Sequence, residues 1–129
     1  MSQEPREHPE VKVGRFVAQW REEVASVTVR LRGWADCPEV AEALNALWMQ
    51  VHTHALDLKA GHVLVDMREL EFISSSGYRT MVVWLSHLAE AKEGERYGIH
   101  FRVDSARDWQ RRGPAALSFF ARGLVTMEP

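Results

Sequence analysis

Three consecutive serines, Ser74, Ser75 and Ser76, stand immediately before Gly77, where an apolar segment gives way to a helical pattern. A serine hydroxyl can cap the free N–H groups at a helix N-terminus. It can also carry a phosphate there, because those N–H groups and the helix dipole favour negative charge. A phosphate would add a charge of about −1.5 to −2 at one surface point and could repel an acidic partner. Capping alone and phosphorylation both remain open from the residues.

A strand followed by serines and a helix also suggests the nucleophile of α/β hydrolases. That nucleophile requires the pattern Gly-x-Ser-x-Gly, and with Ser75 as nucleophile the first glycine is replaced by Ile73. The glycine-rich phosphate loops of nucleotide-binding proteins do not occur in the sequence either. We therefore expect a protein that is not an enzyme, with no catalytic residue and no cofactor.

The other residues that could do chemistry do not form a recognisable set. His52 and His54 are two residues apart and would point to different faces of a helix. Three further histidines stand singly: His62, His87 and His100. Cys37 is the only cysteine, so an internal disulfide is excluded and a reducing, cytoplasmic location is favoured. We predict no metal site.

The first half of the chain predicts a hairpin followed by a helix. Val11–Trp20 and Val24–Leu31 are expected to form two antiparallel strands with their turn at Arg21–Glu23. Asp36 is expected to cap the helix, which Gly61 ends. The apolar stripe of this helix steps by three or four residues: Val40, Leu44, Leu47, Val51, Ala55 and Leu58.

The second half predicts strands and helices in alternation. The unbroken apolar run Val63–Val65 is typical of a central strand covered on both faces. The elements expected after it are a helix at Ser76–Lys92, a strand at Ile99–Val103, helical pieces over Ser105–Phe120 broken at Gly113-Pro114, and a short strand at Leu124–Met127. We therefore predict an α/β fold in which a β-hairpin leads into a mainly parallel sheet of four or five strands with about three helices.

Size and composition fit one globular domain. The chain has 129 residues, of which 46% are hydrophobic and 26% charged. Residues 1–10 are polar and predicted as a flexible lead-in, and residues 11–129 as the domain. The formal net charge of −2 without a basic stripe argues against nucleic acid. No apolar run reaches the roughly 20 residues of a membrane helix, so no membrane partner is expected.

The segment from Asp66 to Gly77 resembles the motif of STAS domains, the small α/β modules of anti-sigma factor antagonists. The family pattern is a strand, then Asp-hydrophobic-x-x-hydrophobic-x-Phe-hydrophobic-Asp-Ser-Ser-Gly, then a helix. The positions that match in spacing are Phe72, Ile73, Ser75, Ser76 and Gly77. Gly33-Trp34-Ala35-Asp36 is similar to the family's Gly-Glu-Leu-Asp turn. The pair Trp109-Gln110 resembles a divergent branch of bacterial STAS-like regulators.

The resemblance implies a regulatory module whose partner binding is switched by phosphorylation. In that family the first serine of Ser-Ser-Gly, here Ser75, is phosphorylated by a histidine-kinase-like ATPase (an anti-sigma or switch kinase), and a PP2C-like phosphatase reverses the reaction. Ser74 replaces the family's aspartate and offers a competing hydroxyl, so Ser74 and Ser76 are alternative acceptors. The loss of that aspartate also favours the alternative, a constitutive scaffold module with the same fold. Weak self-association remains open.

The partner-binding surface is expected to surround the serine loop. Asp36 could contact the partner or only cap its helix, and Trp34 could anchor the interface or cover the first helix. An apolar flank of the second helix could dock the partner or pack on a neighbouring helix. The residues predicted for this surface are Trp34, Asp36, Ser74, Ser75, Ser76, Gly77, Thr80, Val83, Trp84 and His87. Trp109 is expected in the core or in helix packing.

Overall fold

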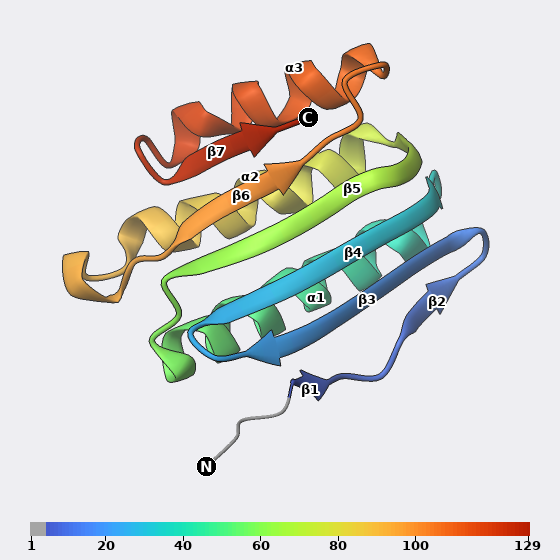
Figure 1. Ribbon diagram of the computed structural model, residues 1–129. Helices are drawn as coiled ribbons and strands as arrows, with labels where there is room; N and C mark the ends of the chain where they lie inside the picture. Colours follow the sequence, from blue (N-terminus) through green and yellow to red (C-terminus); the bar gives the residue numbers. More distant parts are fainter. Residues whose placement is uncertain (1–4) are drawn as a thin grey trace.

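The computed structural model describes residues 5–129 and has the predicted α/β fold with three α-helices (Figure 1). The strands are β1 (Arg6–Glu7), β2 (Val11–Val13), β3 (Phe16–Glu23), β4 (Ser26–Ala35), β5 (His62–Ile73), β6 (Gly98–Arg102) and β7 (Val125–Glu128). The α-helices are α1 (Pro38–Leu58), α2 (Ser75–Glu90) and α3 (Asp108–Leu117), and the short 3-10 helices are η1 (Glu93–Glu95) and η2 (Ser118–Phe120). The sheet thus has seven strands, more than the four or five predicted.

The strands form one mixed sheet in the order β1-β3-β4-β5-β6-β7, with β2 also paired to β3. Strands β4 to β7 are parallel, whereas β1, β2 and β4 run antiparallel to β3. Helices α1 and α2 lie behind the same face of the sheet in Figure 1. Consequently Leu64 on the opposite face is only half-buried, and the prediction that Val63–Val65 is covered on both faces was wrong.

The hairpin is present, but its turn lies three residues later than predicted. Residues 24 and 25 form the turn, because Glu23 still pairs with Ser26 and Ala25 adopts a positive φ of 59°. The predicted turn at Arg21–Glu23 was wrong because Glu22, a charged residue, is buried at 7% exposure where the strand continues. The first strand is also interrupted at residues 14 and 15, which separates β2 from β3.

Part of the predicted lead-in belongs to the sheet. Residues 1–4 lie outside the described residues, but Arg6 and Glu7 pair with Glu22 and Arg21 of β3. The backbone N–H of His8 then donates to the carbonyl of Trp20 at 3.1 Å. A two-residue strand leaves no alternating pattern in the sequence, so periodicity could not predict it.

Helix α1 buries the predicted stripe except Leu58, which is 39% exposed. Its N-cap residue is Cys37 and makes no side-chain capping bond. Asp36 instead accepts a hydrogen bond from Arg15 at 2.9 Å, so its predicted capping role was wrong. The helix ends at Leu58, with Lys59 as its C-cap in the left-handed conformation (φ of 52°), so the predicted end at Gly61 was wrong.

A pair of stacked indoles joins the two helices in the core. The rings of Trp48 on α1 and Trp84 on α2 are 4.5 Å apart and parallel within 1°. Trp48 donates its indole N–H to Thr80 at 3.0 Å, and Trp84 donates to Tyr97 at 2.9 Å. Both buried N–H groups are therefore satisfied, which is what allows two tryptophans to be fully buried.

Helix α3 completes the far end of the sheet. It continues through residues 113 and 114, so the break predicted there was wrong. Gln110 is fully buried and donates its amide to the carbonyls of Met67 at 2.8 Å and Leu70 at 2.9 Å. Strand β6 pairs with β5 only as far as Asp66, so Gln110 replaces the missing strand neighbour there. None of the helices within residues 5–129 is long and apolar enough to cross a membrane.

Candidate functional site

The predicted serine cluster forms the N-terminus of α2, directly after β5. Ser74 is the N-cap residue, and its side-chain oxygen accepts a hydrogen bond from the N–H of Gly77 at 3.1 Å. Its own N–H donates to the carbonyl of Ala35 at 2.8 Å, which ties the serine loop to the end of β4. Ser75 is the first residue of the helix and is exposed, as is Ser76. The three hydroxyls therefore occupy different environments.

Gly77 is required by close packing beneath this cap. It is buried, and a Cβ at this position would lie 2.9 Å from Cγ1 of Ile73 and 3.5 Å from Cδ1 of Leu44. The first distance is closer than carbon atoms normally approach, so a side chain here would displace Ile73. Gly77 thus shapes the serine loop from within, and it contributes no side chain to a partner surface.

A second glycine brings an exposed tryptophan to the same end of the sheet. Gly33 has a φ of 86°, and a Cβ there would lie 1.8 Å from the carbonyl oxygen of Arg15, which accepts the N–H of Trp34. Trp34 pairs with Phe72 of β5, and their ring centres are 6.1 Å apart. The Arg15 guanidinium lies 5.0 Å from the Trp34 ring centre. Trp34 is 39% exposed and Phe72 43%, so an aromatic pair faces solvent beside the serines.

Phe72 continues this surface into a hollow of about 720 Å³ beside the serine loop. The residues that line it come from the end of β5, from α2 and from α3: Phe72, Ile73, Ser74, Ser75, Tyr78, Arg79, Val82, Trp109 and Gly113. Among the described residues, its lining has no carboxylate or imidazole to serve as a general base. The hollow offers apolar area, hydroxyls and one guanidinium, a combination that suits binding of a protein segment.

The far wall of the hollow is held by contacts between α2 and α3. The hydroxyl of Tyr78 donates to the carbonyl of Gly113 at 2.9 Å, and burial raises the pKa of Tyr78. Arg107, just before α3, binds Glu71 of β5 at 2.6 Å and lowers the pKa of that carboxyl group. Both contacts fix α3 next to the serine loop.

The structure separates the predicted surface into two groups. The serine loop, Trp34 and Asp36 gather at the end of β4 and β5. Thr80 and Trp84, however, are 8% and 0% exposed and contact Trp48 of α1, so their prediction as partner-binding residues was wrong and the alternative, packing on a neighbouring helix, is confirmed. Their polar atoms are engaged inside the protein, where Thr80 also donates to the carbonyl of Gly77 at 2.6 Å. Val83 and His87 are exposed on the outer side of α2.

Several residues of the hollow were not predicted as site residues. Arg79 lies four residues after Ser75 and so on the same helix face, a spacing that could have indicated it. Phe72 lies near the end of β5, pairs with Trp34 of β4 and is 43% exposed. Trp109 was expected in the core or in helix packing and lies half-buried on the rim of the hollow.

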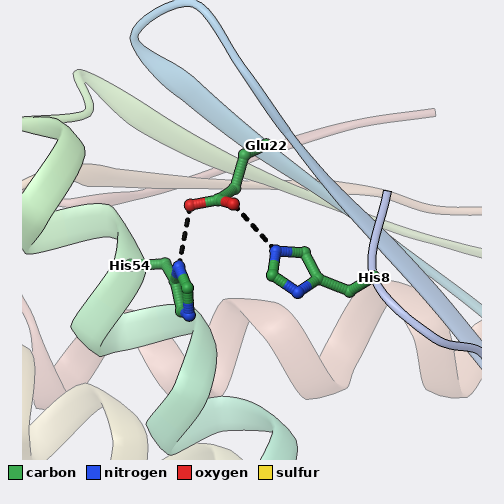
Figure 2. Close-up of side chains that lie close together, drawn as sticks. All are labelled: His8, Glu22 and His54. Atoms are coloured by element: carbon green, nitrogen blue, oxygen red, sulfur yellow. Dashed lines mark hydrogen bonds and ion pairs between the residues drawn. The ribbon is translucent and has the colours of Figure 1, made fainter. Parts of the chain in front are cut away.

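A separate polar cluster lies between β3 and α1, near the end of β3 farther from the serine loop, and Figure 2 shows its three side chains pointing toward one another. His8 and His54 each approach one carboxylate oxygen of Glu22 at 2.8 Å. Burial alone would raise the pKa of Glu22, but the hydrogen bonds from the two histidines outweigh it and lower that pKa. Sequence spacing did not indicate the cluster, because its members lie on three separate segments.

Comparison with solved structures shows that this fold is similar to that of an anti-sigma factor antagonist. The crystal structure of an anti-sigma factor antagonist from Mycobacterium paratuberculosis matches with a TM-score of 0.55 and 11% sequence identity, over 88% of this chain and 86% of that one. No protein-family model matches the sequence, and no curated protein matches it. At this identity the likeness establishes the fold alone, and the predicted α/β fold is confirmed.

Proposed function

We propose that this protein is a regulatory binding module that is switched by phosphorylation of Ser75. Its partners are then a histidine-kinase-like ATPase, which it binds in the unmodified form, and a PP2C-like phosphatase, which restores that form. The observation that carries the proposal is the position of Ser75. Its side chain is exposed at the first residue of α2 and on the rim of the hollow, where a kinase can reach it and a partner can sense it.

The three serines differ in how well they suit this role. The Ser74 hydroxyl already caps α2 through Gly77, so its phosphorylation would disturb the helix start. Ser76 is exposed but does not line the hollow. Ser75 alone combines exposure, a place on the rim and the helix N-terminus that favours negative charge.

Arg79 supplies the electrostatic basis of the switch. It lies one helical turn after Ser75 and lines the same hollow, so an acidic partner group could bind its guanidinium. A phosphate on Ser75 would attract the same guanidinium and repel an acidic partner. Phosphorylation would therefore withdraw a binding group and add a repulsive one without disturbing the core.

The alternative is a constitutive scaffold module. The exposed pair Trp34 and Phe72 and the hollow beside it could bind a partner without any modification. Ser74 in place of the family's aspartate favours this alternative. If the protein is a constitutive scaffold, a negative charge at Ser75 should weaken partner binding only modestly, as any polar substitution at the rim of the hollow would.

Binding of charge variants to a histidine-kinase-like ATPase encoded beside the gene tests the proposal. We expect Ser75→Ala to bind as tightly as the wild type and Ser75→Asp to bind at least about tenfold more weakly, a loss of about 1.4 kcal/mol. Ser76→Asp is the matched control, with the same charge one residue along and away from the hollow. Equal binding by the wild type, Ser75→Ala and Ser75→Asp would contradict the switch and support the scaffold.

A further inference from the structure

His8, Glu22 and His54 meet at one point although they come from three separate segments (Figure 2). His8 follows β1, Glu22 lies on β3, and His54 lies on α1. The Nε2 atom of His8 is 2.8 Å from Oε2 of Glu22, and the Nδ1 atom of His54 is 2.8 Å from Oε1. The ligating nitrogen and oxygen atoms all lie within 4.8 Å of one another.

The surroundings hold these groups in place. The His8 ring stacks on Trp20 at 3.7 Å with the planes within 2°, and the His54 ring meets both of these rings edge-on. The side chain of Glu22 is only 9% exposed, that of His8 13% and that of His54 32%. A carboxylate so poorly solvated needs cationic or donor partners, and His54 leaves a path from solvent.

We propose that these three residues form a binding site for a first-row divalent cation of the Zn²⁺ type. Two imidazole nitrogens and one carboxylate are the ligands that Zn²⁺ takes in three-residue sites, with water completing the coordination. On binding, the ring protons move to Nδ1 of His8 and Nε2 of His54, so that each imidazole binds as a neutral ligand. The cation then replaces two hydrogen bonds by three bonds to the metal.

One neighbouring charge opposes a cation at this site. The Nε atom of Arg6 lies 3.8 Å from Oε2 of Glu22, but its side chain is 74% exposed and can turn into solvent. The metal would tie the N-terminal segment that carries His8 to α1. That segment is also held by the pairing of β1 and β2 with β3, by the backbone bond of His8 to Trp20 and by the stacking of these two rings. The site would therefore add a link from the N-terminal segment to α1, beyond its pairing with β3.

Titration of the metal-free full chain with Zn²⁺, followed by native mass spectrometry and calorimetry, tests the site. We expect one Zn²⁺ per chain and no comparable binding of Mg²⁺, which prefers oxygen ligands. His8→Phe keeps an aromatic ring on Trp20 and removes one ligand, and His54→Gln removes another. Each should weaken Zn²⁺ binding at least about tenfold, the low end for loss of a ligand or its support. His62→Asn, which changes an exposed histidine of β5, should bind as the wild type does.

A measurement on the wild-type chain keeps the test independent of variants that fold poorly. Co²⁺ in place of Zn²⁺ should broaden the ring signals of His8 and His54 in NMR spectra before those of the other histidines. Three results would each overturn the proposal. These are a failure of the chain to bind Zn²⁺ one to one, binding of Zn²⁺ by His8→Phe and His54→Gln as tightly as by the wild type, and broadening by Co²⁺ of the signals of other histidines first. The cluster would then be a hydrogen-bonded network without a metal.

Discussion

The hydroxyl oxygen of Ser74 accepts the backbone N–H of Gly77 at 3.1 Å, so the first serine of the cluster holds the start of α2. Ser75, one residue along, is exposed on the rim of the hollow. Ser74 thus stabilises the helix, whereas the adjacent Ser75 is accessible to a modifying enzyme. Stability and regulation can therefore be tested by separate substitutions.

Ser74→Ala should lower the free energy of unfolding by about 1 kcal/mol, because it removes the N-cap of α2. Ser75→Ala should change it by less than about 0.5 kcal/mol, as is usual for an exposed site away from such features. Urea unfolding of the two variants beside the wild type measures both. Equal losses from the two substitutions would mean that the cap is not formed as described.

Trp84→Ala should lower the free energy of unfolding by about 3–5 kcal/mol, because it empties a fully buried site and leaves the hydroxyl of Tyr97 without its donor. Val83→Ala, one residue away and exposed, is the control and should cost less than about 1 kcal/mol. Unfolding in guanidinium chloride measures the free energy of unfolding of both variants. A small loss for Trp84→Ala would show that this side chain is not in the core.

Gln110→Leu should destabilise the fold although leucine is apolar and similar in size. It leaves the buried carbonyls of Met67 and Leu70 without their donor, at roughly 1–3 kcal/mol for each unsatisfied group. It also removes the acceptor of the Asp104 N–H, which lies 2.7 Å from the amide oxygen. Chemical unfolding measures the loss, and a variant as stable as the wild type would contradict this account of the β5 edge.

His52 should make the fold less stable as the pH falls. Burial, with a smaller effect of His87, lowers the pKa of His52, and its Nδ1 lies 2.7 Å from the Tyr97 hydroxyl. A histidine whose pKa is lower in the folded state adds stability above its unfolded pKa of about 6.5 and loses it as the pH falls below that value. Thermal unfolding between about pH 7.5 and 5.5 should therefore show a steeper loss for the wild type than for His52→Gln. Parallel profiles would contradict the prediction.

Local patterns in the sequence predicted most elements of the fold. The stripe of α1 and the alternation in β4 and β6 are short-range signals, and the structure confirms them. The serine loop was also predictable, because the cap Ser74 and the buried Gly77 lie three residues apart. These features depend on neighbours in sequence.

The environments of some residues could not be predicted, because they depend on contacts between segments that are far apart in the sequence. For Trp84 the sequence predicted either partner docking or packing on a neighbouring helix, because the choice depends on Trp48, a residue of another helix. Glu22 was predicted to lie in a turn. Its burial in β3 depends instead on His8 and His54, which are 14 and 32 residues away. No spacing rule within one element could have indicated either environment.

The central claim is that Ser75 carries a regulatory phosphate. Intact-mass and peptide mass spectrometry of the protein purified from its native cells, under several growth conditions, tests it most directly. The account predicts a fraction of the protein with one added phosphate that maps to Ser75, and loss of that fraction in Ser75→Ala but not in Ser76→Ala. Unmodified protein under every condition, together with no transfer to Ser75 from a neighbouring histidine-kinase-like ATPase, would contradict the switch.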